Sequence, residues 1–386
     1  MLPKGFKSSG IACGLKKSAN KDLAVIYSEY DCNCSAVFTT NTVKAQCVLD
    51  NQNILNNNSK IRLIIANSGN ANACVGEAAI QAINNIKKSG AELFNIKQNE
   101  ILTASTGIIG VPLNSELIIQ GLKILKNQLS QDFKDFSEAI LTTDLKTKVF
   151  SKKLGKFSQI TGITKGSGMI HPNMATMLAF IMTDAKISTD NLKQALKEAN
   201  EISFNQISVD GDTSTNDMVI LLSNGASNEE VNIEEFQAVL NEVCIDLAKK
   251  IVIDGEGANK IFEVSVNGAK SLEQAKKISR GIVSSSLVKS AIFGNDPNWG
   301  RILAAAGQYG DFNIKETSLK IFDVILLKNG QPVNFNKQEL SLKIKENKEI
   351  FINLDLALNL ENKHSSIAWG CDLSYDYVRI NAEYTT

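Results

Sequence analysis

Short apolar runs separated by turn-forming residues dominate the N-terminal part of the chain. Runs of this length and composition are typical of β-strands, whose ends fall where turn formers cluster. We expect strands at Leu23 to Tyr27, Ala36 to Phe38 and Ile61 to Ala66. The first third of the chain is therefore predicted to be rich in β-structure.

Three later segments carry apolar residues at the spacing of an amphipathic helix. The first is Glu77 to Lys88, and Gly90 just after it is the expected helix stop. The second is Leu192 to Ala199, where apolar residues recur every three or four positions. The third is Phe236 to Ile251, with Asn232 placed to act as its N-cap.

Strand-like patterns return at Val264 to Val266, Leu319 to Leu327 and Val378 to Ala382. Helices and strands that alternate along a chain predict a layered α/β architecture. No internal repeat or low-complexity tract interrupts this pattern. The least ordered segments are expected at Asn51 to Lys60, which is rich in asparagine, and at Lys146 to Lys156, which is rich in lysine.

The segment from Lys165 to Ala185, KGSGMIHPNMATMLAFIMTDA, combines features that no other segment shares. A glycine-rich stretch leads to Pro172 and Asn173, and Thr176 is followed at once by the apolar run Met177 to Met182. We predict a strained loop that enters a buried strand, with a threonine hydroxyl at the mouth of that strand.

A threonine in this position has a chemical use. Its hydroxyl is a weak nucleophile at neutral pH and needs an adjacent base, but the chain has only two histidines. Cleavage between Ala175 and Thr176 would free an α-amino group, whose pKa of about 7.7–8.0 suits a base. Gly166 and Gly168 permit the backbone distortion that such a scissile bond needs. The alternative is a structural loop in which Thr176 caps a core strand.

Composition narrows the class of protein. The chain has 386 residues, 43% hydrophobic and 21% charged, which allows two domains or one large α/β body. Its 41 basic and 41 acidic residues give no net charge, which argues against a nucleic-acid binder. No apolar stretch reaches the ~18 residues of a membrane span, and no apolar signal-peptide core is present. We therefore expect a cytoplasmic enzyme without nucleic-acid or membrane partners.

Metal sites are not expected. The seven cysteines are scattered and are taken to be reduced, and the pair Cys32 and Cys34 has no second pair beside it. The two histidines, His171 and His364, are far apart in the sequence. Asp210 to Asp217 resembles the start of a calcium loop but lacks the glycine and glutamate that such a loop needs at its sixth and twelfth positions.

Three glycine-containing motifs could contribute to a site. Ala104 to Gly110, ASTGIIG, suits an oxyanion hole built from a hydroxyl and a backbone amide, or else a tight turn. In Val252 to Asn259, Glu256 lies between two glycines and could pair with a substrate ammonium, or could belong to a solvated turn. Phe293 to Arg301 suggests a shaped loop at a pocket or interface, although a structural turn explains it nearly as well.

Together and in this order, these motifs resemble those of the glutamate N-acetyltransferases of arginine biosynthesis of the ornithine acetyltransferase type. Members of that family cleave themselves and use an N-terminal threonine as nucleophile. The resemblance covers essentially the whole chain, and the KGSGMIHPNMATML block is its most specific part. The matching segments are Asn67–Cys74, Ala104–Gly110, Leu141–Asp144, Lys165–Leu178, Val209–Asp217, Asp254–Ala258, Gly294–Ile302 and Asn381–Thr386.

The resemblance implies a role for each matching residue. Thr176 would be the nucleophile, released by cleavage after Ala175, and Thr106 with Gly107 would form the oxyanion hole. The residues that would contact substrate are Thr142, Lys165, Thr176, Glu256, Asn381 and Thr386. Thr143 adjoins Thr142, and the sequence does not decide which of the two makes the contact.

The implied reaction moves an acetyl group from N2-acetylornithine to glutamate by a ping-pong mechanism through acetyl-Thr176. Residues 1–175 would form an α chain and residues 176–386 a β chain, two of each in a heterotetramer. The implied fold is an αββα-type sandwich, as in self-processing N-terminal-nucleophile acyltransferases, with an additional C-terminal α/β portion. No cofactor is implied. Some family members also accept acetyl-CoA as donor, and no motif here decides that point.

Two other functions fit parts of the same pattern. An N-terminal-nucleophile peptidase or amidase of similar fold would use water as the acceptor instead of glutamate. A non-catalytic metabolite-binding protein would never cleave itself. The coincidence of Thr176, Thr106, Gly107 and Lys165 in one chain disfavours the binding protein, whereas the acceptor of the second step separates the acetyltransferase from the hydrolase.

Overall fold

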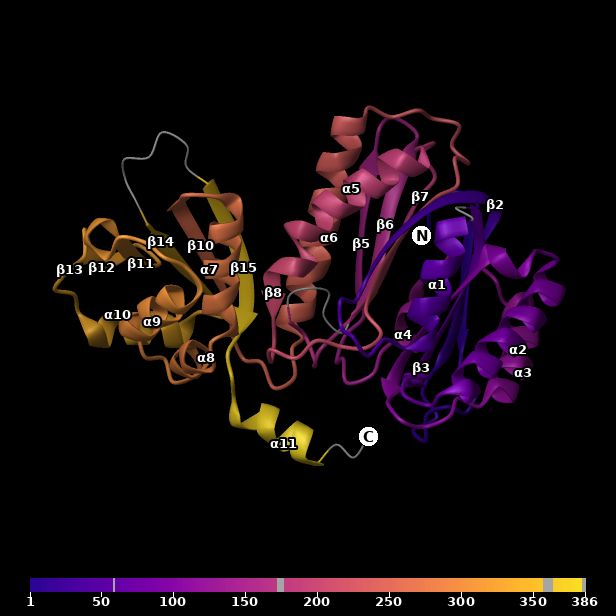
Figure 1. Ribbon diagram of the computed structural model, residues 1–386, viewed down its shortest axis with the longest axis horizontal. Coiled ribbons are helices and arrows are strands. Elements are labelled where there is room, and N and C mark those ends of the chain that lie inside the picture. The colour runs from indigo at the N-terminus through magenta and orange to yellow at the C-terminus, as the bar shows by residue number, and fades with distance from the viewer. Residues whose placement is uncertain (58–59, 172–176, 357–363, 384–386) are drawn as a thin grey trace.

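The computed structural model describes residues 1–57, 60–171, 177–356 and 364–383. The chain forms a layered sandwich followed by a smaller α/β unit, and the two lie side by side (Figure 1). Within the described ranges, no helix is long and apolar enough to cross a membrane. Nor do three or more His, Cys, Asp or Glu side chains from those ranges gather as metal ligands.

The first sheet has eight strands in the order β4-β3-β2-β9-β7-β6-β5, with β1 added on β2. Its strands are β1 (Phe6–Ile11), β2 (Leu23–Phe38), β3 (Lys60–Asn70), β4 (Ile101–Ile108), β5 (Lys148–Leu154), β6 (Ser158–Lys165), β7 (Leu178–Thr183) and β9 (Met218–Ser223). The central strands β7 and β9 are buried along their whole length, as expected for continuous apolar runs.

The long strand β2 joins two halves of this sheet. Its first part pairs with β3 and its last six residues pair with β9, with a shift of register between Tyr27 and Cys32. Side chains of both halves share one hydrophobic core, which includes Ile64 of β3 and Phe180 of β7. The two halves therefore face each other as the inner layers of a sandwich.

Helices cover the outer faces of both halves (Figure 1). On one side, α2 (Glu77–Phe94) and α3 (Ser115–Asn127) pack on β2, β3 and β4. On the other side, α5 (Thr189–Glu201) and α6 (Ile233–Ile253) pack on β6, β7 and β9. This arrangement is the αββα sandwich expected from the family resemblance. Two further helices, α1 (Gln46–Asn57) and α4 (Lys134–Ala139), contribute to the central core.

The second unit is built on a seven-stranded sheet in the order β13-β12-β11-β14-β10-β15-β8. Its strands are β8 (Ile207–Ser208), β10 (Ile261–Ala269), β11 (Ser318–Ile321), β12 (Val324–Lys328), β13 (Gln331–Pro332), β14 (Glu349–Asp355) and β15 (His364–Cys371). Its helices are α7 (Leu272–Ser284), α8 (Ser286–Phe293), α9 (Trp299–Tyr309) and α10 (Lys337–Glu346). Three short 3₁₀ helices are Gln98–Glu100, Phe204–Gln206 and Ile314–Glu316. The expected C-terminal α/β portion is thus present.

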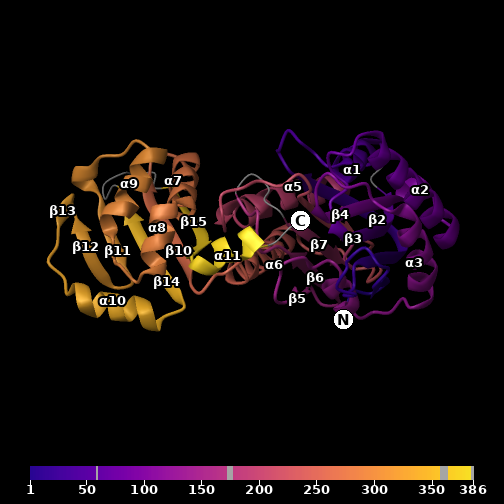
Figure 2. The same ribbon diagram turned by 90° about the horizontal axis from the view of Figure 1, so that it is seen from below.

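Two elements link the units. Strand β8 follows α5 in the chain but pairs with β15 of the second sheet. The last helix, α11 (Tyr375–Glu383), leaves the end of β15 and runs back toward the sandwich (Figures 1 and 2). All nine residues of α11 are described, and none of them is buried.

Most predicted elements are confirmed. The three early strand segments lie in β2 and β3, and the run after Thr176 forms β7. The segment Val264 to Val266 lies in β10. The second and third predicted helices are α5 and α6, and the Asn232 side chain accepts hydrogen bonds from Glu234 and Glu235 as the N-cap of α6.

The prediction that Gly90 ends its helix is wrong, because α2 continues to Phe94 and ends at Asn95 in the left-handed conformation. Gly90 instead marks a close approach of α2 to the sheet. A Cβ at this position would lie 3.1 Å from Ile65 and 3.3 Å from Ile101. The glycine therefore reflects helix–sheet packing, which the local sequence does not reveal.

Two segments expected to be poorly ordered are regular. Most of Asn51 to Lys60 belongs to α1, where the buried Asn51 exchanges hydrogen bonds with the backbone of Thr103. Most of Lys146 to Lys156 forms β5, which is buried at its two ends, Lys148 and Leu154, and partly exposed between them. In both segments, polar residues of the kinds that are common in loops make tertiary contacts within regular structure.

Two predicted strands also need correction. The run Leu319 to Leu327 is two strands, β11 and β12, because Phe322 turns the chain with a φ of 55°. The run Val378 to Ala382 lies in helix α11 instead of a strand. The β-branched and apolar residues of this run predict a strand, but the run pairs with no strand of either sheet.

Candidate active site

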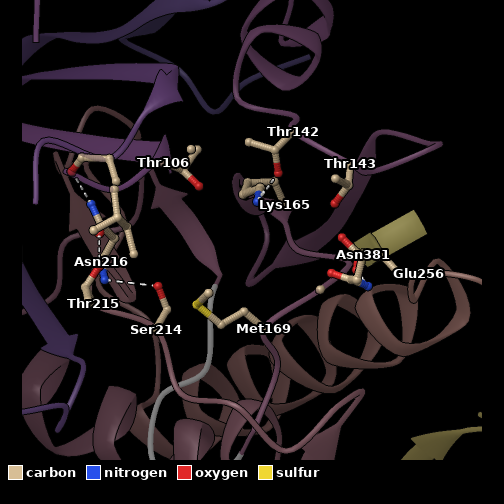
Figure 3. A pocket seen from close by; sticks show the side chains of 14 residues that line it. Thr106, Thr142, Thr143, Lys165, Met169, Ser214, Thr215, Asn216, Glu256 and Asn381 are labelled. Atoms are coloured by element: carbon tan, nitrogen blue, oxygen red, sulfur yellow. Dashed lines mark hydrogen bonds between the residues drawn. The ribbon is translucent and has the colours of Figure 1, made fainter. Parts of the chain in front are cut away.

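A pocket of about 230 Å³ opens between the sandwich and α11 (Figure 3). Most of its lining side chains carry hydroxyl, amide, amino or carboxylate groups. The lining residues are Ala71, Thr106, Gly107, Ile109, Thr142, Thr143, Lys165, Gly168, Met169, Ser214, Thr215, Asn216, Glu256 and Asn381. A volume of this size suits a small metabolite.

Thr106 and Gly107 lie near the end of β4, where β3 and β4 approach irregularly. Gly107 has a φ of 130°, and a Cβ there would lie 2.5 Å from the carbonyl carbon of Gly69. A side chain at residue 107 would therefore require a shift of β3 or β4. The buried Thr106 places a hydroxyl beside Gly107.

A buried chain of charges supports the pocket on the side of Lys165. The ammonium of Lys165, only 2% exposed, donates to the Thr142 hydroxyl at 2.7 Å and lies 3.7 Å from Asp144. Asp144 also pairs with Lys148 at 2.7 Å and accepts the amide of Gly166. The strand end that carries Lys165 is thus held to the loop that carries Thr142.

The charge chain continues to Asp254, which pairs with Lys148 at 2.6 Å. The same carboxylate accepts the backbone amides of Leu145 and Lys146, so it fixes the loop before β5. Its backbone oxygen accepts the Ser167 hydroxyl at 2.6 Å. The alternating charges leave each buried ion with a partner of opposite sign.

Burial and charge set the protonation of this group. Burial by itself would raise the pKa of Asp144, but the charges of Lys165 and Lys148 outweigh that effect and hold the pKa well below its usual range. Burial lowers the pKa of Lys165, and the carboxylate of Asp144 opposes that shift. A second lysine, Lys16, donates to the carbonyls of Lys21 and Leu141, and burial lowers its pKa to about 8.

Glu256 closes the opposite side of the pocket, near Thr143 (Figure 3). Its carboxylate accepts a hydrogen bond of 2.8 Å from the amide of Asn381 on α11. A Cβ at Gly168 would lie 2.4 Å from that carboxylate, so the glycine leaves room for Glu256. The start of α11 is anchored by Ser374, whose hydroxyl donates to the carbonyl of Gly257.

The pocket brings together residues from widely separated parts of the sequence. Six of the predicted site residues line it: Thr106, Gly107, Thr142, Lys165, Glu256 and Asn381. Both Thr142 and Thr143 do so, and only the Thr142 hydroxyl is bonded to Lys165. Ala175, Thr176 and Thr386 lie outside the described residues.

Some lining residues were not singled out from the sequence. Met169 lies within the glycine-rich loop, and Ser214, Thr215 and Asn216 lie in a segment that matches the family and resembles the start of a calcium loop, but to which no role was assigned. The high density of hydroxyl and amide side chains directly before β9 could have indicated these residues. The motif Phe293 to Arg301 is a structural turn, in which Asn298 caps α9.

The αββα sandwich and its polar pocket fit an acyltransferase, an enzyme that moves an acyl group between small molecules, and family membership establishes that class. The chain belongs to the ArgJ family, whose model matches residues 7–386. A role in arginine biosynthesis follows from that membership.

Relatives of similar length match this chain over its whole length. The arginine biosynthesis bifunctional protein ArgJ of one Bacillus cereus strain is 47% identical, over 100% of this chain and 96% of the relative. The protein of that name from Thermotoga neapolitana is 45% identical over 100% of both chains. A crystal structure of the ArgJ protein from Bacillus halodurans is 42% identical with a TM-score of 0.49, over 52% of this chain and 96% of that chain.

Proposed function

We propose that the enzyme transfers an acetyl group from N2-acetylornithine to glutamate through an acetyl ester on Thr176. The observation that carries this proposal is the convergence of Thr106, Gly107, Lys165 and Glu256 on one small pocket. The pocket offers an oxyanion site, a cation for a carboxylate and an anion for an ammonium. N2-acetylornithine has all three complementary groups: an acetyl carbonyl, an α-carboxylate and a side-chain ammonium.

The nucleophile would arise by self-cleavage between Ala175 and Thr176. The Thr176 hydroxyl attacks the Ala175 carbonyl, the amide bond is exchanged for an ester, and water hydrolyses the ester. The resulting chains, 1–175 and 176–386, would stay together. Their strands are interleaved, since β6 pairs with β7 and β2 pairs with β9 across the division.

Each half-reaction then passes through a tetrahedral oxyanion. The free amine of Thr176 takes the hydroxyl proton, and the hydroxyl attacks the acetyl carbonyl of N2-acetylornithine. The Gly107 amide and the Thr106 hydroxyl stabilise the oxyanion, and ornithine leaves. Glutamate attacks the acetyl ester through its α-amine, which gives N-acetylglutamate and restores the Thr176 hydroxyl.

Two amino acids share the pocket because both carry an α-amine and an α-carboxylate. Lys165, held by Thr142, suits the carboxylate. Glu256, held by Asn381, suits the side-chain ammonium of ornithine. Thr386 and one of the two adjacent threonines would complete the substrate contacts.

Further features of the proposal come from the family resemblance. They are a heterotetramer of two α and two β chains, a cytoplasmic location and the lack of a resident cofactor. Acetyl-CoA would be a second acetyl donor. A donor assay that compares acetyl-CoA with N2-acetylornithine decides whether the enzyme serves one or both reactions.

Replacement of the nucleophile tests the proposal. Thr176→Ala should give one uncleaved chain without acetyl transfer, because both steps need the hydroxyl. Thr176→Ser retains a hydroxyl and should still cleave and transfer. Denaturing electrophoresis and release of ornithine in the presence of glutamate measure the two steps. A Thr176→Ala chain that still splits at this bond would show that the nucleophile is another residue.

The acceptor separates this function from that of a hydrolase. An acetyltransferase incubated with N2-acetylornithine should form N-acetylglutamate in proportion to added glutamate. An amidase would release acetate at the same rate with or without glutamate. A metabolite-binding protein would give neither product and would run as one full-length band.

A further inference from the structure

Two buried residues, Asn216 and Asp217, lie at the edge of the site without a part in the proposed reaction. They end the segment that resembles a calcium loop and directly precede β9. Strand β9 lies between β2 and β7 in the first sheet. The two side chains bond to different parts of the active site.

The side chain of Asn216 holds the strand ends that carry the oxyanion site. Its amide nitrogen donates to the carbonyl of Ala71 at 2.7 Å and to that of Ser105 at 2.8 Å. Figure 3 shows Asn216 beside Ser214 and Thr215 at the edge of the pocket. Its amide oxygen accepts the hydroxyl of Thr215 at 2.5 Å. Ser105 is directly followed by Thr106, so these bonds act one residue from the proposed oxyanion donors.

The side chain of Asp217 holds the other half of the site. One carboxyl oxygen accepts the backbone N–H of Met177 at 2.8 Å. The Met177 carbonyl in turn accepts the backbone N–H of Met218 at 3.2 Å. The Met177 nitrogen is covalently bonded to the carbonyl carbon of residue 176, so the first hydrogen bond acts next to the proposed nucleophile.

An aspartate is unusual as the acceptor for a backbone amide here, because the Asp217 side chain is wholly buried. Its second carboxyl oxygen has no hydrogen-bond partner among the residues that the structure describes. Burial raises the pKa of this carboxyl well above its usual value, against the opposing effects of the Met177 amide and the Lys165 charge. The Met177 amide requires only an acceptor oxygen, which the carboxyl group supplies at 2.8 Å.

We propose that Asn216 and Asp217 are positioning residues that fix the oxyanion strand and the nucleophile segment relative to each other. The inference rests on the proposed function, because it takes Thr176 as the nucleophile. Adjacent residues are separated by a fixed Cα distance of about 3.8 Å. The groups that hydrogen-bond to Asn216 and those that hydrogen-bond to Asp217 are therefore held at a nearly fixed separation by the backbone between the two residues.

The proposal predicts opposite results for two substitutions of nearly equal shape. Asp217→Asn retains an acceptor oxygen for the Met177 amide, and the self-cleavage rate and kcat should stay within about threefold of wild type. Asn216→Asp replaces two N–H donors with an acceptor facing two carbonyl oxygens. Self-cleavage and kcat should then fall by about tenfold or more, since an unmade buried hydrogen bond costs about 1–3 kcal/mol.

Asp217→Ala removes the acceptor altogether. Self-cleavage and kcat should fall by about tenfold or more, with KM for N2-acetylornithine within about twofold of wild type, because Lys165 and Glu256 still hold the substrate. The matched control is Ser223→Ala at the far end of β9. The buried Ser223 hydroxyl bonds Ile187 and Ala185, so its loss should lower the thermal midpoint without changing cleavage or kcat.

Cleavage time courses, steady-state kinetics and thermal unfolding of all variants decide the matter, with Thr176→Ala measured beside them. Asp217→Ala at wild-type rates overturns the inference, and so does Asp217→Asn as slow as Asp217→Ala. The inference is also overturned if kcat and KM change by the same factor and in step with the thermal midpoint, because that result indicates a merely structural role. These results leave the proposed function intact. Acetyl transfer by Thr176→Ala instead removes the proposed function and the inference together.

Discussion

At the residue scale, the pocket depends on glycines at places where a larger residue would collide with a neighbour. Gly107 meets the backbone of Gly69, and Gly168 meets the side-chain carboxylate of Glu256. A side chain at residue 107 would displace one of two strand backbones, whereas a side chain at residue 168 would displace the Glu256 carboxylate. Substitutions at either position should therefore alter the pocket without the loss of a functional side chain.

Gly107→Ala should reduce kcat by about 10²–10³, the usual effect of losing one oxyanion donor. The added Cβ would lie 2.5 Å from a backbone carbon of Gly69, so the strand that carries the amide must shift. Steady-state kinetics of acetyl transfer measure the effect.

Gly110→Ala is the matched control. Gly110 also has a positive φ, of 81°, but a Cβ there meets nothing within 4 Å. The variant should lose about 1 kcal/mol of stability through backbone strain and should retain kcat. Equal loss of kcat in both variants would show that the left-handed conformation matters and that the close approach to Gly69 does not.

At the element scale, the site is assembled by loops that buried charges hold against strand ends. Lys165 ends β6, Lys148 begins β5, and Asp144 and Asp254 join them to the preceding loop and to the end of α6. Each carboxylate also accepts backbone amides. The sequence did not predict these ion pairs, because charged residues usually lie on the solvated surface.

Asp254→Ala should destabilise the fold by about 3–5 kcal/mol, as expected when one member of a buried ion pair is removed. The change leaves Lys148 short of one partner and frees the amides of Leu145 and Lys146. Thermal unfolding measures the loss. In the control Glu230→Ala, which breaks the exposed pair with Lys186, the thermal midpoint should not change. Equal midpoints for the two variants would contradict the prediction.

At the scale of the whole molecule, the site lies where the two units meet, and one hydrophobic core includes residues of α5 and α6 together with Ile261 of β10 and Trp369 of β15. Strand β8 ties the units by pairing with β15, and α11 brings Asn381 from the second unit to the pocket. Because α11 buries no residue, it adds to the site without adding to a hydrophobic core.

Deletion of residues 375–386 should leave self-cleavage intact and raise KM for N2-acetylornithine by about tenfold or more. The deletion removes the amide of Asn381 that orients Glu256, and a hydrogen bond to a charged group is worth about 1.5–3 kcal/mol. Asn381→Ala should reproduce most of the effect, whereas Val378→Ser, at an exposed position of α11, should not. A truncated enzyme with wild-type KM would show that α11 takes no part in binding.

The sequence by itself determined the local features of this protein. Apolar periodicity marked α5, α6, β7 and β10, because such spacing depends only on which face of one element is buried. The motifs around Thr106, Lys165 and Glu256 likewise marked residues that line one pocket, because the functional groups they supply are intrinsic to the residue types.

Only the tertiary structure decided which residues meet. It turned the apolar run near Val378 into the unburied helix α11 and made the asparagine-rich segment at Asn51 a helix packed on β4. It also gave Asn216 and Asp217 their partners, which come from strands more than a hundred and about forty residues away in the chain. Burial and hydrogen bonding at such positions depend on how distant strands pack together, and no local pattern of residues records that packing.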